Sequence, residues 1–240
     1  SHASMPIGAY SEKHIMPENK LVPVPDGVSD EVASCVTLKG ITAEYLLHRA
    51  YPLKKGDKVL YHAAAGALGQ ILCPWANSIG AEIIGTVGSK EKEEIAKKNG
   101  CHHVINYTDK NFVEEVEKVV GKNAIDVVYD GVGLKTFEGS IEVLKIRGMM
   151  VAFGNASGYV DTIDVKKHIN AKGLFFTRPS IAHYTIEREE LLESAKKVFD
   201  AVLSGKFKIE ISKKYSLDEV KQAHEDLEGR LLTGPAVIKP

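Results

Sequence analysis

The sequence predicts an α/β protein whose core is a parallel β-sheet covered by helices on both faces. From Gly56 onward, short apolar segments alternate with longer amphipathic segments. The short segments are apolar throughout rather than at every second residue, as in strands that are covered on both faces. A tight glycine turn follows the first of them, and strands separated by helices form βαβ units. These three observations favour a doubly wound sheet.

Six strands are expected in this sheet, at 58–62, 82–87, 103–106, 125–130, 149–153 and 174–177. The helices between them are expected at 67–79, 90–99, 112–120, 136–144 and around 165–170. Gly80, Gly100 and Gly121 follow the first three helices, where glycine commonly ends a helix, and Asp109 is expected to cap the third. Six strands complete a Rossmann-type sheet, and the alternative is a flavodoxin-like sheet with another ligand.

Segments on either side of the sheet follow other patterns. Residues 1–28 are rich in Pro and Gly, Ser29 is expected to cap one helix, and Thr42 is expected to begin a second over 43–50. The elements expected after the sheet are a long helix over 187–203, a strand over 208–215, a capping box from Ser216 to Glu219 that opens a further helix, and a strand over 236–238. We therefore expect three parts, with bounds at 1–38, 39–180 and 181–240.

The composition excludes several classes of function. The chain has 240 residues, 44% of them hydrophobic, and a net charge of −1, which gives no electrostatic basis for binding nucleic acid or an anionic membrane. Its apolar runs are too short to span a bilayer. Cys35, Cys73 and Cys101 are not at zinc-ligand spacing. Free cysteines without a signal peptide indicate a reducing compartment, the cytoplasm.

The turn after the first strand is typical of a phosphate-binding site. Residues 59–69 are predicted to form a buried strand, a turn of small residues and the start of a helix. Gly66 and Gly69 let backbone N–H groups approach a pyrophosphate, and the helix N-terminus adds partial positive charge. Ala64 stands where the dinucleotide-binding fingerprint has its first glycine, so the motif is a variant.

The end of the second strand indicates which dinucleotide would bind. NAD-binding proteins place an Asp or Glu about 20 residues after the glycine turn, where it holds the ribose hydroxyls. Here the sequence offers Ser89, Lys90 and Lys92 instead. A small pocket rich in donors suits a 2′-phosphate and favours NADP(H). The alternative is that Lys90 and Lys92 are ordinary exposed residues of a helix.

Several further short segments of the chain are distinctive. They are LKGITA (38–43), HAAAG (62–66), VINY (104–107), VVYD (127–130), FGNASG (153–158) and TRP (177–179). In these segments the chain resembles the zinc-free, zeta-crystallin-like quinone oxidoreductases of the medium-chain dehydrogenase/reductase superfamily. The matches run in family order from GAY (8–10) to the C-terminus and cover essentially the whole chain.

The resemblance implies a set of residues around NADP(H). Those at the pyrophosphate are Gly66, Ala67, Leu68 and Gly69. Those around the 2′-phosphate are Gly88, Ser89, Lys92 and Tyr107. Those toward the ribose and nicotinamide are Val132, Phe153, Gly154, Asn155, Phe176 and Thr177, and Tyr45 matches a further family contact. Tyr107 also follows the third strand, at the edge where ligands bind, which favours this role over the alternative of a plain strand-end aromatic.

The resemblance also implies a reaction. It is metal-free hydride transfer from the nicotinamide to a quinone or conjugated enone, and none of the nine histidines and three cysteines is expected to bind a metal. The alternatives are an enoyl-thioester reductase and a crystallin-like protein that binds NADPH without turnover. NADPH consumption with an ortho-quinone, repeated with NADH, would separate these.

The start of the chain departs from the family pattern. Family members begin with a longer segment that builds most of a GroES-like, β-rich catalytic lobe, of which 1–38 and 181–240 would be remnants. We therefore assign no catalytic residue, and expect NADPH binding with weak or no turnover. Family members also pair through the outer strand of the sheet, so Leu174, Phe175 and Phe176 predict a homodimer.

Overall fold

The computed structural model describes residues 8–108, 111–229, 231–232 and 234–240. The chain divides into two compact units, which are described separately. The first, here called the sheet unit, comprises Leu46–Ala65 and Leu72–Ser180. The second, the flanking unit, comprises the described residues before Leu46, the short stretch Gly66–Ile71, and the described residues after Ser180.

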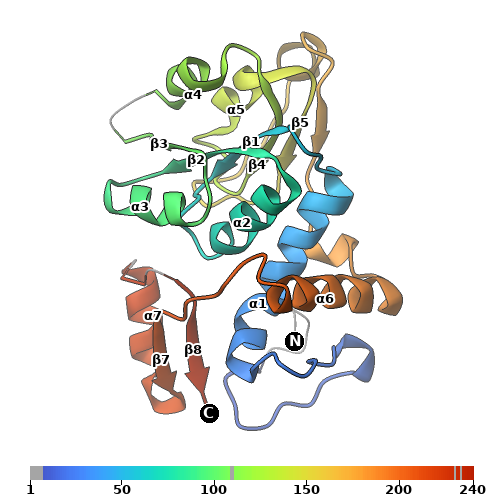
Figure 1. The fold of residues 1–240 in the computed structure, drawn as a ribbon, viewed down its shortest axis with the longest axis vertical. Coiled ribbons are helices and arrows are strands. Elements are labelled where there is room, and N and C mark those ends of the chain that lie inside the picture. Colours follow the sequence, from blue (N-terminus) through green and yellow to red (C-terminus); the bar gives the residue numbers. More distant parts are fainter. Residues whose placement is uncertain (1–7, 109–110, 230, 233) are drawn as a thin grey trace. The chain divides into compact units, whose positions relative to one another are not determined.

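A six-stranded, all-parallel sheet forms the centre of the sheet unit, in the order β3-β2-β1-β4-β5-β6 (Figure 1). Its strands are β1 (Lys58–His62), β2 (Glu82–Val87), β3 (His103–Asn106), β4 (Ile125–Asp130), β5 (Leu144–Ala152) and β6 (Phe175–Thr177). The chain moves outward from β1 to β3 and then returns to continue from β4, so the direction reverses between β1 and β4. This confirms the predicted doubly wound fold, which binds ligands at such a reversal.

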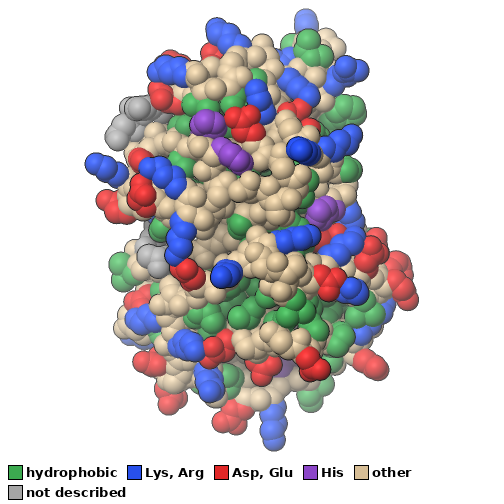
Figure 2. All heavy atoms as spheres, viewed as in Figure 1, with side chains coloured by type: hydrophobic (Ala, Val, Ile, Leu, Met, Phe, Trp, Pro, Cys, Tyr) green, Lys and Arg blue, Asp and Glu red, His purple; other side chains and the backbone are tan. Residues whose placement is uncertain are grey.

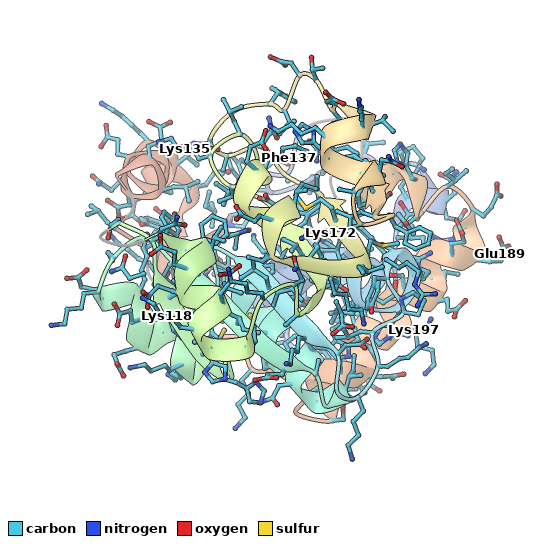
Figure 3. The ribbon with its side chains drawn as sticks, turned by 90° about the horizontal axis from the view of Figure 1, so that it is seen from above. Lys118, Lys135, Phe137, Lys172, Glu189 and Lys197 are labelled. Carbon is cyan, nitrogen blue, oxygen red and sulfur yellow. The ribbon has the colours of Figure 1, made fainter. Side chains whose placement is uncertain are left out.

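Helices connect these strands. They are α2 (Gly69–Ile79), α3 (Glu91–Lys98), α4 (Phe112–Val120), α5 (Phe137–Val143) and the π-helical turn η3 (Val165–Asn170). Helices α4 and α5 cover a core of large apolar side chains that includes Leu60, Ile84 and Val128 of the sheet. The ammonium of Lys172 donates to the carbonyl oxygens of Glu142 and Leu144, at 2.5 and 2.8 Å, where α5 ends (Figure 3).

In the flanking unit, α1 (Asp30–Tyr45) packs against α6 (Arg188–Leu203). A side chain at Gly40 would collide with Val198, so this glycine allows the two helices to approach closely. Two parallel strands, β7 (Lys213–Ser216) and β8 (Ala236–Lys239), accompany α7 (Val220–Glu228). The remaining short helices are η1 (Glu18–Lys20), η2 (Leu46–Ala50, in the sheet unit), η4 (Ile181–His183) and η5 (Leu217–Glu219).

Several predicted boundaries are wrong. No second helix begins at Thr42, because α1 is continuous through Gly40, whose role is close packing rather than helix termination. The strand predicted over 208–215 is confined to β7, and β5 begins five residues before the predicted Met149, with a register shift against β4 between Ile125 and Val127. Asp109 lies outside the described residues. The side chain of Asn111 caps α4 by accepting from the Val113 N–H at 3.0 Å.

Among the residues described, no helix has the length and apolar character needed to cross a membrane. On the face seen in Figure 2, basic and acidic side chains are interspersed rather than gathered by sign.

Candidate cofactor-binding edge

Because all six strands of the sheet unit are parallel, their carboxyl ends meet at one edge. Gly88 and Ser89 follow β2, Tyr107 follows β3, and Val132 follows β4. Phe153, Gly154 and Asn155 follow β5, and Thr177 ends β6. The structure therefore brings these eight predicted residues to the edge at which doubly wound sheets bind ligands.

The turn after β1 depends on a glycine in the neighbouring strand. Ala64 is fully buried, and its N–H donates to the carbonyl oxygen of Thr86 at 3.0 Å. A Cβ atom on Gly85 would lie 2.7 Å from the Ala64 Cβ and 2.7 Å from the Cys101 Sγ. The absence of a side chain on β2 thus gives Ala64 the room that the fingerprint normally obtains with a glycine in the turn itself.

The rest of that turn, Gly66 to Leu68 and the first residues of α2, belongs to the flanking unit. Its first helical hydrogen bond joins the Gln70 N–H to the Gly66 carbonyl oxygen at 3.1 Å. Ala67 and Leu68 are half-buried, and the predicted helix start at Ala67 falls two residues before the observed one at Gly69.

Polar side chains gather where β2 and β3 end. Tyr107 is 37% exposed, and a Cβ atom on Gly88 would lie 3.1 Å from its hydroxyl oxygen. The phenol therefore lies next to the bare backbone of Gly88. Ser89 is half-buried, while Lys90 and Lys92 are exposed.

A carboxylate that the sequence analysis overlooked lies beside Ser89. This carboxylate belongs to the exposed Glu91. The backbone N–H of Glu91 and the side chain of Ser89 both hydrogen-bond to it, and these bonds lower the pKa of Glu91. The sequence-based interpretation of this strand end named Ser89, Lys90 and Lys92 but omitted Glu91, the first residue of α3. Glu91 could have been noticed from the sequence, because it is only two residues after Ser89.

The end of β4 is organised by a buried carboxylate. Asp130 is 0% exposed, and its Oδ1 accepts hydrogen bonds from the N–H groups of Val132 and Gly133 at 2.7 and 2.9 Å. Its Oδ2 accepts from the hydroxyls of Thr136 at 2.8 Å and Ser140 at 3.4 Å. Hydrogen bonds to a carboxylate are stronger than those between neutral groups, so Asp130 fixes the positions of these four donors.

The loop after β5 is fastened to the loop after β4. The carbonyl oxygen of Asp130 accepts from the N–H groups of Phe153 at 2.9 Å and Gly154 at 3.2 Å, and the Ser157 N–H donates to the Val132 carbonyl oxygen at 2.8 Å. A Cβ atom on Gly154 would lie 2.7 Å from the Cα of Gly131, so the two backbones are in direct contact.

Two predicted residues have their side chains engaged elsewhere. The partly buried Phe176 ring packs edge-on against Phe137, at 6.3 Å between centroids, at the border of the core that includes α5. Tyr45 lies in the flanking unit, is 2% exposed, and stacks on Tyr184 at 4.4 Å. Its role at a cofactor stays a prediction.

A buried histidine continues the hydrogen bonding behind this edge. His62 is 1% exposed, its Nδ1 is 2.8 Å from the Thr86 hydroxyl, and its Nε2 is 2.9 Å from the Ser140 hydroxyl. Burial lowers the pKa of His62, against an opposing influence of the nearby Asp130. The ring is therefore neutral at pH 7, and a proton on Nε2 satisfies every group from Thr86 through Ser140 to Asp130.

The family model described as zinc-binding dehydrogenase matches residues 67–203. The chain belongs to this family. A 2-haloacrylate reductase from Burkholderia is 44% identical over 98% of the chain and 72% of that protein. Quinone oxidoreductase 1 of Escherichia coli is 40% identical over 100% of the chain and 74% of that protein. These relatives confirm the resemblance drawn from the sequence motifs.

Solved structures with similar names match the fold of this chain. The crystal structure of Escherichia coli quinone oxidoreductase complexed with NADPH matches with a TM-score of 0.93 and 40% identity, over 100% of this chain and 74% of that one. The structure of a 2-haloacrylate reductase matches with a TM-score of 0.94 and 43% identity, over 99% and 74% of the two chains.

The family description mentions zinc, but the described part of this chain does not provide a site for it. Among those residues, no group of three or more His, Cys, Asp or Glu side chains could hold a metal ion. Cys35, Cys73 and Cys101 are all buried and free. We therefore derive no catalytic step through zinc.

Proposed function

We propose that this chain binds NADPH along the strand-end edge and passes hydride from the nicotinamide to an electron-poor conjugated carbon, as in a quinone or enone. One observation carries the proposal: the strand ends that bear the predicted contacts lie at one edge of the parallel sheet, on both sides of the reversal between β1 and β4. The relatives named as quinone oxidoreductases, and the matching structure solved with NADPH, support it.

The residues predicted to contact NADPH form groups, and each group is suited to one part of the cofactor. The N–H groups of residues 66–69 would hold the pyrophosphate. The donors of Ser89, Lys92 and Tyr107, around the bare backbone of Gly88, would hold the 2′-phosphate. The loops that contain Val132 and 153–155, with Thr177 and the backbone of Phe176, would orient the nicotinamide, and Tyr45 is a further proposed contact. The cofactor supplies the hydride, and the protein supplies binding and orientation.

Glu91 opposes this preference for a phosphate. Its carboxylate accepts from Ser89, and it would repel the 2′-phosphate of NADPH if both approached that hydroxyl. The donors Ser89, Lys92 and Tyr107 favour NADPH over NADH. We expect Glu91 to make this preference smaller than it would be without that carboxylate.

Calorimetric titration with NADPH and with NADH tests the cofactor assignment. Tighter binding of NADPH is expected, and the substitution Ser89→Ala should reduce that preference. Equal affinities in the unaltered chain, or no binding of either, would overturn the assignment.

The acceptor is tested by NADPH oxidation with three classes of substrate: an ortho-quinone, a 2-haloacrylate and an enoyl thioester. The 2-haloacrylate reductase relative favours including the second, which shares with quinones a C=C bond conjugated to a carbonyl group. Oxidation with the quinone or the haloacrylate supports the proposal. Exclusive use of the thioester favours an enoyl reductase, and binding without any turnover favours the crystallin-like alternative.

We also propose a homodimer formed through β6. This strand is at the edge of the sheet, and Phe175 on it is 56% exposed. An exposed apolar edge strand is suited to pairing with a second copy. Light scattering tests this: a monomer at micromolar concentration, or a dimer that persists after Phe175→Lys, would count against it.

Two further proposals concern organisation and location. We retain the three-part description with bounds at 1–38, 39–180 and 181–240, which limited proteolysis of the chain would test through cleavage near residues 38 and 180. The three free cysteines support a reducing compartment, and we propose the cytoplasm. Imaging of the tagged chain in its own cell would test the location.

A further inference from the structure

The side chain and the carbonyl group of Asp130 act on both loops at the nicotinamide end of the proposed site. Its carboxylate accepts from the N–H groups of Val132 and Gly133, and its carbonyl oxygen accepts from those of Phe153 and Gly154. One residue thereby fixes the two backbone segments on which the nicotinamide contacts are predicted. No side-chain atom of Asp130 is exposed, so it acts through these loops rather than by touching a ligand.

The conformation of the loop after β4 depends on a hydrogen-bond acceptor at residue 130. Val132 and Gly133 present two adjacent N–H groups to the same Oδ1 atom, which curls the loop around the carboxylate. A buried N–H group that loses its acceptor destabilises the folded chain, so the loop would turn these groups toward water if the carboxylate were removed. Backbone contact between Gly131 and Gly154 would carry that movement to the loop after β5.

The other carboxylate oxygen is held from within the sheet unit. Thr136 and Ser140 of the α5 region donate to Oδ2, and Ser140 is in turn bound by His62, which is neutral and bound to Thr86. This row of buried groups joins β1, β2, β4 and α5. It sets the rotamer of Asp130 and therefore the direction in which Oδ1 points.

We propose that Asp130 is the positioning residue for the nicotinamide half of the cofactor, an inference that rests on the proposed NADPH binding. The adenosine half, held at the ends of β2 and β3, does not depend on it. The two halves of one cofactor should therefore respond differently to a change at Asp130.

The experiment compares two ligands. NADPH occupies both halves of the site, whereas 2′,5′-ADP, the adenosine bisphosphate, lacks the nicotinamide. In Asp130→Ala, the dissociation constant for NADPH should rise about tenfold, as expected for loss of about 1.4 kcal/mol, while that for 2′,5′-ADP changes less than about twofold. Asp130→Asn retains an acceptor oxygen for Val132 and Gly133 and should recover most of the loss.

A matched control is available on the same strand. Asp126 is also buried, at 7% exposure, but lies at the opposite end of β4, where it accepts from the Lys58 N–H at 2.7 Å and pairs with Lys145. Asp126→Ala should lower stability without changing the ratio of the two dissociation constants. If Asp130→Ala does not fold, Thr136→Val removes one donor to Oδ2 and should raise the ratio about threefold.

The outcomes separate the two claims. If the unaltered chain binds neither ligand, the proposed function fails. If it binds both but Asp130→Ala and Thr136→Val change the two affinities equally or not at all, the positioning role is overturned while NADPH binding stands. The same result follows if Asp126→Ala changes the ratio as much as Asp130→Ala does.

Discussion

The two halves of the strand-end edge are built differently. At the ends of β2 and β3, the groups suited to a ligand are side chains that reach solvent: Tyr107 is 37% exposed, Lys92 is exposed and Ser89 is half-buried. At the ends of β4 and β5, they are backbone segments fastened to a buried carboxylate. The first half would recognise a charged group through replaceable side chains, and the second would hold a planar ring through a fixed backbone.

This difference determines how each half should tolerate change. A side chain at the adenosine half can be removed with a local loss of affinity. A change at the nicotinamide half must move backbone, so it should cost stability and binding together. The following variants test that contrast.

The largest effect is expected from Gly154→Ala. Its new Cβ atom would lie 2.7 Å from the Cα of Gly131, so backbone must shift, and overpacking of this kind costs about 1–3 kcal/mol. Urea unfolding should show that loss, together with weakened NADPH binding. Gly88→Ala is the control from the other half, because its Cβ atom would meet only the end of the Tyr107 side chain, at 3.1 Å. Equal destabilisation by the two variants would refute the contrast.

The next effect is expected from Ser89→Ala and Tyr107→Phe. Each removes one hydroxyl that would bind the 2′-phosphate, and hydrogen bonds to charged groups contribute about 1.5–3 kcal/mol, so NADPH affinity should fall at least about tenfold. Affinity for NADH and stability should change little. Calorimetric titration with both cofactors provides the measurement. An equal loss of affinity for NADH, which lacks the 2′-phosphate, would show that these hydroxyls do not bind that phosphate.

A smaller, pH-dependent effect is expected from His62. Because burial lowers its folded-state pKa below the unfolded value of about 6.5, the unfolded chain binds the extra proton first. The contribution of neutral His62 to the free energy of unfolding is complete above pH 6.5, roughly, and is lost as the pH falls below that value, by up to about 1.4 kcal/mol per pH unit. The melting temperature, measured at several pH values from 7 to 5, should fall more steeply with decreasing pH for the unaltered chain than for His62→Gln. Identical slopes would contradict this.

The smallest effect is expected from Glu91→Gln. The substitution removes an exposed like charge next to the proposed position of the 2′-phosphate, and water screens such charges strongly, so the preference for NADPH over NADH should rise only about two- to threefold. The increase should diminish at high salt, because screening weakens interactions between exposed charges. An unchanged preference at low salt would show that Glu91 does not oppose the phosphate.

The sequence predicted the sheet well because each strand is encoded locally. The predictions for 58–62, 82–87, 103–106 and 125–130 match β1, β2, β3 and β4 in full. Three of these strands, β1, β2 and β4, are buried almost throughout, and buried parallel strands are recognisable as largely apolar runs bounded by polar residues or glycine. The second helix predicted to begin at Thr42 is wrong, because α1 continues through this region and Gly40 lies inside it against Val198, far along the chain. A glycine that separates helices and one that permits close packing look alike in sequence.

The candidate site divides in the same way. Ser89 and Tyr107 could be found because their chemistry is local to a strand end. The chain of groups from His62 to Asp130 could not, because His62 and Ser140 are 78 residues apart and only the fold brings them within 2.9 Å. Glu91 was missed although its position beside Ser89 is local.

The fit of Ala64 against Gly85 has a consequence for how such turns are recognised. The Ala64 methyl group occupies the space that a side chain on Gly85 would need, so the two positions share a single volume. Gly85 cannot gain a Cβ atom while Ala64 keeps its own, and Cys101 limits Gly85 from another side. A search pattern confined to the turn would score Ala64 as a defect, whereas a pattern that pairs the turn with the adjacent strand would recognise an intact dinucleotide fold.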